Sequence, residues 1–389
     1  NFSHDFPFPE PREQQNDAIS AGIETLLISD KRFFVLEAGT GVGKSAIGLT
    51  IASYISRHLS SKDEFKSGAY YLTTQKILQQ QYVDDFGNTS HRMKDLKSSS
   101  NYTCSFQGNI SCGEGLRALK VAKKNSDFFH HCIRNCVYKQ AKQSFIDGRH
   151  GITNFSYFLA ETQYAGKLEP RDVLVVDEAH NIESELSKFI EVSISGAFVE
   201  RILKMKIPAV STQNQAHRWI RDVYVPKLSE YFVILEAKIE KLLGGKEKLA
   251  EFEKIARQVE IVDKHLCKIR RFLKVYSADN WVFNDIAPGY KSSRKLEFKP
   301  IDVSPFADEL LYRMGRKVIM MSATILDGDA FCKSLGIPED DVEFISIASP
   351  FPAENRPIMF FPIGRMNASN IDSTLPKLAE AVRSILEQH

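Results

Sequence analysis

The feature that most constrains the fold is a glycine-rich octapeptide, AGTGVGKS, at residues 38–45. An apolar run at residues 33–36 precedes it and indicates a strand, and residues 47–55 behind it have the apolar spacing of a helix. A strand, a glycine-rich turn with Lys44 and Ser45, and a helix form the layout of a phosphate-binding P-loop. The glycines let backbone N–H groups surround a phosphate, and the helix N-terminus favours its negative charge. The octapeptide therefore predicts an α/β fold with a nucleotide site at the turn.

Two side chains of the loop have specific expected tasks. Lys44 is expected to reach the β- and γ-phosphates of ATP, and the Ser45 hydroxyl is expected to hold Mg²⁺. Alanine stands at the first position, where the usual pattern has glycine. The predicted ATP contacts in the loop are Ala38, Gly39, Thr40, Gly41, Val42, Gly43, Lys44 and Ser45.

A second motif, VLVVDEAH at residues 173–180, is an apolar strand that ends in acidic residues. Asp177 at the carboxyl end of a strand can bind the Mg²⁺ shell, and Glu178 is placed to orient and deprotonate an attacking water. The P-loop alone would suit a kinase, a transporter or a GTPase, whereas both motifs together indicate a nucleoside triphosphatase. The alternative is a glycine-rich turn and an acidic strand end that never meet. The predicted catalytic residues are Lys44, Asp177, Glu178 and His180.

Length and composition set only broad limits. The 389 residues are enough for two or three domains, and 43% hydrophobic and 26% charged residues are ordinary for a soluble globular chain. The net charge of +2 does not exclude a local basic path for nucleic acid. No stretch approaches the roughly 20 apolar residues that span a bilayer. The first residues lack the basic start and apolar core of a signal peptide. We therefore expect no membrane and a location in the cytoplasm or nucleoid, or in the nucleus of a eukaryote.

Four of the six cysteines fall close together, at Cys104, Cys112, Cys132 and Cys136. A cytosolic chain does not normally keep disulfides, so this quartet suggests a metal site. Four thiolates suit a [4Fe–4S] cluster or a Cys₄ zinc site, and the spacing alone does not choose between them. His130 or His131 could also complete a Cys₃His zinc site, and four unligated cysteines remain a third reading.

Alternating strands and helices at residues 33–86 and from residue 173 onwards predict a parallel sheet, with further strands at residues 69–72 and 317–324. Two insertions interrupt this pattern. The first, at about residues 98–149, holds the cysteine quartet. The second, at about residues 193–298, has two stretches with apolar spacings of three and four residues, and Gly244 and Gly245 separate them. This second insertion predicts an antiparallel helical hairpin.

The order of these motifs resembles the iron–sulfur superfamily 2 helicases, the XPD/DinG family, over nearly the whole chain. FPEPREQQ at residues 8–15 resembles the adenine-contacting segment of that family, with Gln15 as the contact. LTTQKILQQQY at residues 72–82 looks like the motif that touches single-stranded DNA, and SATI at residues 322–325 resembles the motif that couples hydrolysis to strand movement. ITNFSYFL, at residues 152–159, is similar to the stretch before the DEAH strand. The implied DNA contacts are Thr73, Thr74 and Gln75.

The resemblance implies a RecA-like P-loop parallel sheet with an iron–sulfur cluster insertion and a helical Arch insertion. It favours [4Fe–4S] over zinc at the cysteine quartet. It also implies six segments: motor domain 1 at residues 1–97, 151–192 and 299–350, the cluster domain at 98–150, the Arch at 193–298, and the start of a truncated motor domain 2 at 351–389.

The activity implied by the resemblance is ATP-dependent 5′→3′ movement on single-stranded DNA, including forked or structured DNA, in the context of DNA repair. Residues 354–364 look like the opening strand of the second motor domain and residues 375–386 like its first helix. The arginine-rich motif of that domain is absent, so we expect a fragment of a longer helicase. The alternative is a non-catalytic nucleic-acid clamp or assembly subunit that uses ATP binding as a switch.

Overall fold

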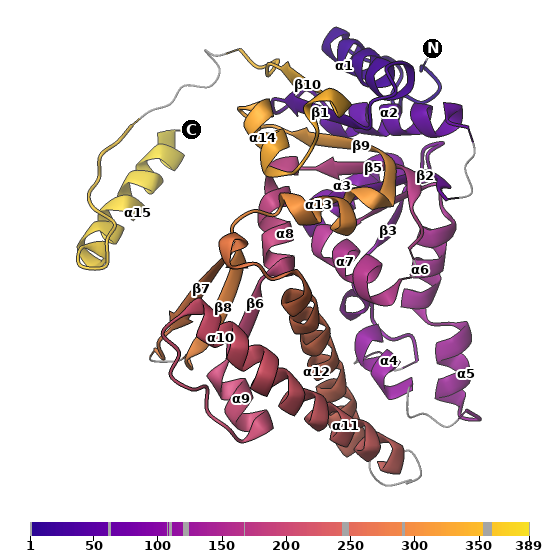
Figure 1. Ribbon diagram of the computed structural model, residues 1–389. Coiled ribbons are helices and arrows are strands. Elements are labelled where there is room, and N and C mark those ends of the chain that lie inside the picture. The colour runs from indigo at the N-terminus through magenta and orange to yellow at the C-terminus, as the bar shows by residue number, and fades with distance from the viewer. Residues whose placement is uncertain are drawn as a thin grey trace. The chain divides into compact units, whose positions relative to one another are not determined.

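The computed structural model describes residues 2–60, 64–106, 108, 111–119, 124–166, 168–242, 249–289, 292–352 and 360–388. The chain forms two compact units, Asn1–Ala348 and Ser349–His389. The first unit contains a central sheet and the two insertions, and its helices and strands are drawn in Figure 1.

The centre of the first unit is a parallel sheet of seven strands in the order β10-β1-β9-β5-β2-β4-β3. The inner strands are buried on both faces, which is why they read as continuous apolar runs rather than alternating ones. The strands are β1 (Phe33–Ala38), β2 (Lys66–Thr73), β3 (Lys94–Leu96), β4 (His150–Asn154), β5 (Arg171–Asp177), β9 (Gly315–Ser322) and β10 (Val342–Ile347).

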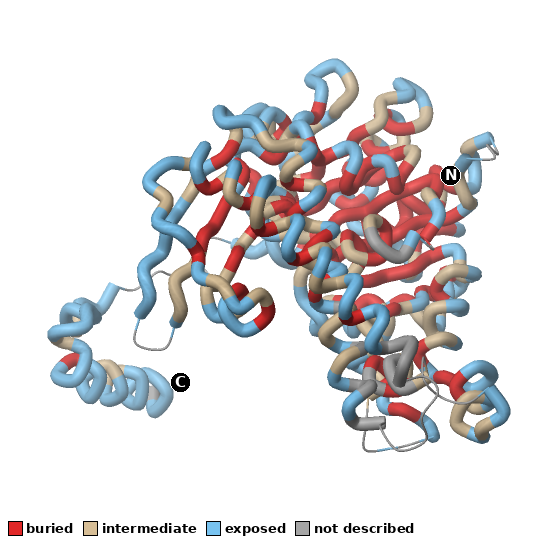
Figure 2. Tube along the Cα trace, turned by 60° about the horizontal axis from the view of Figure 1, so that its bottom comes forward, coloured by how far each residue is buried: buried red, intermediate tan, exposed pale blue. Residues whose placement is uncertain are grey.

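Helices cover both faces of this sheet, so side chains alternate along each strand between two apolar cores. On β1, Phe34 and Leu36 belong to one core, and Phe33 and Val35 belong to the other. Figure 2 shows the buried residues running along the strands. The helices packed on the sheet are α1 (Glu13–Ile23), α2 (Lys44–His58), α3 (Lys76–Phe86), α7 (Phe155–Ala160), α8 (Ile182–Ile190), α13 (Ser304–Leu310) and α14 (Gly328–Ser334).

The first insertion lies between β3 and β4. It consists of α4 (Cys112–Leu119), α5 (Asp127–Arg134) and α6 (Val137–Asp147), all short helices. Helix α6 returns the chain to the sheet, where Phe145 is fully buried against Tyr70 of β2. The insertion is therefore held to the seven-stranded sheet through α6.

Arg171, the first residue of β5, is fully buried at the point where α6 ends. One guanidinium nitrogen donates to the carbonyls of Ala69 and Arg149 at 3.1 and 2.9 Å. The other donates to the carbonyls of Phe145 and Ile146 at 2.9 and 3.1 Å. A cation near a helix C-terminus is favourable because unpaired carbonyls gather there. Arg171 thus joins the end of α6 to two strands of the sheet.

The second insertion contains the predicted helical hairpin, formed by α11 (Val225–Leu242) and α12 (Leu249–Val275), which pack against each other. The Gly244-Gly245 turn lies outside the described residues. Helix α12 also contacts α4 of the first insertion. An antiparallel sheet in the order β6-β8-β7, which the sequence analysis missed, closes the base of this insertion. The strands of this sheet are β6 (Val192–Ser195), β7 (Trp281–Ile286) and β8 (Lys295–Pro300), and the insertion also contains α9 (Gly196–Leu203) and α10 (Gln213–Trp219).

The second unit contains one described helix, α15 (Ile371–Gln388), which confirms the helix predicted at residues 375–386. The opening strand predicted at residues 354–364 is wrong for its described part, because residues 360–364 form no strand. The remainder of that prediction, residues 354–359, lies outside the described residues. A strand is stabilised by pairing with a neighbour, and the described part of this unit contains no other strand.

Candidate nucleotide-binding site

The P-loop joins β1 to α2, as the sequence predicts. Gly41 and Gly43 both have φ of 89°, in the left-handed region that favours glycine. Helix α2 begins at Lys44 directly behind them, so the loop amides and the helix N-terminus share one side of the turn. A Cβ atom on Gly43 would lie 2.5 Å from Nε2 of Gln15, so a side chain there would displace that residue.

The Lys44 ammonium donates a hydrogen bond to the carbonyl of Ala38 at 3.1 Å. This contact folds the lysine over its own loop, where the phosphates of a nucleotide would compete for it. The charge of Lys44 also acts on Asp177, 133 positions later in the chain. The structure therefore brings the two predicted halves of the site together, and the alternative in which they never meet is wrong.

Gln15 and Arg12 hold the P-loop from the N-terminal segment. Gln15 is 4% exposed, and its Nε2 donates to the carbonyl of Val42 at 2.8 Å. Arg12 donates from its guanidinium to the carbonyl of Gly41 at 2.9 Å, and its backbone N–H donates to Oε1 of Gln15 at 2.9 Å. Sequence reasoning found Gln15 and missed Arg12. The only signal for Arg12 was its place in the same octapeptide, FPEPREQQ.

Asp177 is the last residue of β5, and Glu178 follows it. Asp177 is 7% exposed; burial raises its pKa, while a hydrogen bond from Tyr82 and the charge of Lys44 act in the opposite direction. Its Oδ1 accepts from the backbone N–H of Glu178 at 2.9 Å. Glu178 has φ of 54°, a conformation that non-glycine residues rarely adopt and that concentrates at functional sites.

His180 connects the DEAH segment to the SAT segment. Its Nδ1 lies 2.7 Å from Oγ of Ser322 and 3.4 Å from a carboxylate oxygen of Glu178. The Ser322 hydroxyl in turn accepts from the backbone N–H of Thr324 at 3.2 Å. One imidazole ring therefore lies between the Glu178 carboxylate and the SAT segment.

Glu37, the residue before the P-loop, is a part of the site that sequence reasoning missed. One carboxylate oxygen accepts from the backbone N–H groups of Ile325 and Leu326, at 2.7 and 2.8 Å. The other accepts from the Ser346 hydroxyl at 2.8 Å. The Leu326 contact is the main one that lowers the pKa of Glu37. This carboxylate holds the loop after SAT beside β10.

The three predicted DNA contacts lie between β2 and α3, and they differ in accessibility. Thr73 is fully buried, and its hydroxyl has no hydrogen-bond partner among the described residues. Thr74 is half-buried and Gln75 is exposed. In this conformation only Thr74 and Gln75 are accessible to a strand.

The four predicted cluster cysteines are all buried, with exposures of 2–4%. Burial, together with the neighbouring thiols of Cys136, Cys104 and Cys112, raises the pKa of Cys132 to about 11. The four thiols therefore act on one another, although the described residues contain no group of three or more His, Cys, Asp or Glu arranged to hold a metal ion.

A cavity lined by three lysines lies between two helices of the sheet layer, α7 and α8, and helix α12 of the second insertion. It is bounded by α7, α8 and α12, and Lys268 donates to the carbonyl of Lys188 at 3.3 Å. Burial lowers the pKa of Lys268, since the charged form loses solvent there. The lining residues are Ser156, Leu159, Glu185, Lys188, Phe189, Lys264 and Lys268.

Two sequence comparisons each match a part of the chain. Residues 8–211, more than half of the chain, match the family model described as the type III restriction enzyme res subunit. A protein of Methanocaldococcus jannaschii, named as a probable ATP-dependent helicase, is 25% identical over 206 residues. That match covers 46% of this chain and 30% of the relative, so the chain spans less than a third of the length of that relative.

The fold also matches a solved structure. One titled XPD helicase superposes with a TM-score of 0.52 at 16% identity, over 87% of this chain and 63% of that one. At this identity the likeness concerns the fold, and it confirms the predicted α/β fold and the predicted XPD-like arrangement around a RecA-like parallel sheet. Among the described residues, no helix combines the length and the apolar character needed to cross a bilayer.

Proposed function

The chain belongs to the type III restriction enzyme res subunit family, and from this premise we propose that it is the nucleotide-binding motor part of an ATP-dependent DNA helicase. The observation that supports this most is the meeting of the P-loop with the DEAH strand end, where the charge of Lys44 acts on buried Asp177. The relative from Methanocaldococcus jannaschii, named as a probable ATP-dependent helicase, supports the same class.

The residues divide the work of ATP hydrolysis as follows. The amides behind Gly41 and Gly43 cradle the phosphates, and Lys44 leaves the Ala38 carbonyl to neutralise them. Ser45 and Asp177 would hold Mg²⁺, which supplies charge neutralisation at the phosphates when bound.

Glu178 orients the attacking water and accepts its proton. His180 contacts both this carboxylate and the hydroxyl of Ser322, so a change in the charge of Glu178 alters the hydrogen bond to Ser322. Ser322 lies in the segment expected to couple hydrolysis to strand movement. Gln15, held against the loop by the Val42 carbonyl, remains the proposed adenine contact.

The proposed partner is single-stranded DNA, with movement in the 5′→3′ direction, and forked DNA is a further proposed substrate. Thr74 and Gln75 are the contacts that a strand can reach, at the carboxyl end of β2. The lysine-lined cavity beneath α12 supports an anionic partner, since Lys188, Lys264 and Lys268 share its wall. The direction and the choice of single strands rest on the family resemblance.

Nucleotide binding by the 389-residue chain tests this proposal directly. A fluorescent ATP analogue should bind the chain, and Lys44→Ala should abolish binding because the phosphates lose their only P-loop cation. Lys333→Ala, at an exposed position of α14, is the matched control and should bind like the parent. Equal binding by the Lys44 variant would contradict the proposal. In the full-length protein, binding without strand-stimulated hydrolysis would instead favour the ATP-switched clamp.

We further propose that the cysteine quartet holds a [4Fe–4S] cluster, whose role is to stabilise the first insertion. The donor set supports this, because four buried thiols lie within electrostatic reach of one another around short helices with little core of their own. Cys104, Cys112, Cys132 and Cys136 would be the ligands, as deprotonated thiolates.

Metal and sulfide analysis of protein purified without oxygen checks the cluster. About four irons and four sulfides per chain are expected, with loss of both in Cys112→Ser. Cys332→Ser is the matched control, since Cys332 is equally buried but stands alone on α14. One zinc without sulfide in the parent protein would overturn the iron–sulfur assignment. The absence of both iron and zinc would overturn the assignment of the quartet as a metal site.

A further inference from the structure

Tyr82 lies in the interior of the site, on a helix that the sequence analysis connected only with DNA. It stands on α3, which begins at Lys76 directly after the segment 73–75. Its side chain is 2% exposed, and its hydroxyl reaches Asp177 at the nucleotide site. The hydroxyl is the one polar atom of the Tyr82 side chain.

That hydroxyl is bonded to one of the two side chains proposed to hold Mg²⁺. It donates to Oδ2 of Asp177 at 3.0 Å, a contact between residues 95 positions apart. Burial and the charge of Asp177 raise the pKa of Tyr82, and the Ser45 side chain acts in the opposite direction. The other oxygen of Asp177 accepts from the backbone N–H of Glu178. Both carboxylate oxygens of Asp177 are thus oriented by the protein before a metal arrives.

Ring packing fixes the position of the hydroxyl. The Tyr82 ring meets Phe86 edge-on, with centroids 5.7 Å apart, and lies 6.1 Å from the ring of Tyr71. A buried aromatic ring held on two sides has little freedom to move its para oxygen.

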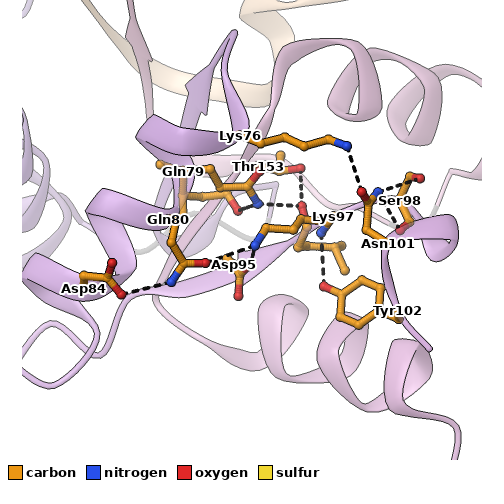
Figure 3. A network of polar contacts seen from close by, with 12 residues as sticks. Lys76, Gln79, Gln80, Asp84, Asp95, Lys97, Ser98, Asn101, Tyr102 and Thr153 are labelled. Carbon is orange, nitrogen blue, oxygen red and sulfur yellow. Dashed lines mark hydrogen bonds and ion pairs between the residues drawn. The ribbon is translucent and has the colours of Figure 1, made fainter. Parts of the chain in front are cut away.

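The outer side of α3 is anchored as well, by the polar network in Figure 3. Gln79 donates to the carbonyl of Leu96 at 3.0 Å, and the same carbonyl accepts from the Thr153 hydroxyl at 2.7 Å. Lys76 donates to Asn101 at 2.8 Å, and Lys97 donates to Gln80 at 3.2 Å. These contacts tie α3 to β3, β4 and the turn behind β3, so the helix that carries Tyr82 is held at several points.

From this geometry we propose that Tyr82 is a positioning residue for the metal-bound nucleotide: its hydroxyl orients Asp177, one of the two proposed Mg²⁺ ligands, before the metal binds. The inference rests on the proposed nucleotide site and extends it. Groups that orient metal ligands through hydrogen bonds raise metal affinity because the ligands need not be ordered on binding. Removal of the hydroxyl therefore weakens the Mg²⁺-dependent part of nucleotide binding and leaves the metal-free part intact.

Tyr82→Phe tests the proposal, since it removes one oxygen and keeps the ring. The readout is binding of a fluorescent ATP analogue to the 389-residue chain while Mg²⁺ is titrated. The half-saturating Mg²⁺ concentration is expected to rise about 10-fold, the lower end of the usual cost of losing such a contact. The affinity for the analogue without Mg²⁺ is expected to stay unchanged.

Tyr71→Phe is the matched control. Tyr71 is 1% exposed on the adjacent strand β2, and its hydroxyl is bonded to Nδ1 of His150 at 3.1 Å rather than to a metal ligand. It should keep the Mg²⁺ dependence of the parent. Thermal melting without ligand checks that both variants fold. In an Asp177→Asn background, Tyr82→Phe should not change the half-saturating Mg²⁺ concentration further, because Tyr82 acts through Asp177.

The outcomes separate this inference from the proposed function. If the parent chain binds nucleotide with a Mg²⁺ dependence that Tyr82→Phe leaves unchanged, the role of Tyr82 is refuted and the nucleotide site stands. An equal shift in Tyr71→Phe would also refute it, since the effect would then come from packing. If the parent chain binds no nucleotide at any Mg²⁺ concentration, the proposed function itself fails.

Discussion

Glu178→Gln is expected to lower ATP turnover by about 10²–10⁴-fold, the usual contribution of a general base. Glutamine has nearly the same shape but accepts no proton at neutral pH, so the attacking water stays neutral. The backbone at Glu178, with φ of 54°, aims the side chain away from the strand and beside His180. Nucleotide binding should persist, because Lys44 and the loop amides are untouched.

Steady-state hydrolysis by the full-length protein, with and without single-stranded DNA, measures this effect. Glu183→Gln provides the control, since Glu183 is an exposed carboxylate in the first turn of α8, five residues further on. It should turn over ATP like the parent. Turnover by Glu178→Gln within a factor of about three of the parent would rule out the assigned base and, with it, the mechanism proposed for the DEAH segment.

Arg171→Met is expected to lower the free energy of unfolding by at least about 3 kcal/mol, because several buried carbonyls lose their donors at once. Methionine retains much of the apolar bulk that stacks on Tyr70, where the guanidinium carbon lies 4.2 Å from the ring centroid. The loss should therefore report the hydrogen bonds to Ala69, Arg149, Phe145 and Ile146 rather than a cavity.

Urea unfolding followed by circular dichroism compares this variant with Arg316→Met. Arg316 also lies at the start of a strand, as the second residue of β9, but it is half-buried and donates to one carbonyl, that of Ser60, at 2.9 Å. Its replacement should cost about 1 kcal/mol. Equal losses in the two variants would show that Arg171 is an ordinary strand-end arginine and does not join α6 to the sheet.

Local patterns were sufficient for the elements that carry the site. The apolar run before the glycines and the helical spacing after them both became regular elements, β1 and α2, because each depends on neighbouring residues alone. The DEAH strand and the hairpin of α11 and α12 were likewise visible in their periodicity. Strand β10 and the sheet β6-β8-β7 were not, since their residues become strands through pairing with distant partners.

The strand predicted at residues 360–364 does not form, and the reason is again the need for a pairing partner. Its apolar residues favour an extended backbone, but a strand forms only where a neighbour supplies hydrogen bonds. Thr73 illustrates the limit for single residues. The motif placed it next to Thr74 and Gln75, but the final position of β2 points it inward while its neighbours stay accessible.

The sequence by itself determined that a phosphate-binding turn and an acidic strand end exist, that four cysteines cluster, and that the core is a parallel sheet. These follow from short-range preferences of the backbone and from the periodicity of burial. Only the tertiary structure decided which groups serve the site beyond the predicted contacts: Arg12 on the loop, Glu37 between SAT and β10, and Tyr82 on Asp177. The physical reason is that such contacts depend on strand order and helix placement, which no local stretch of residues specifies.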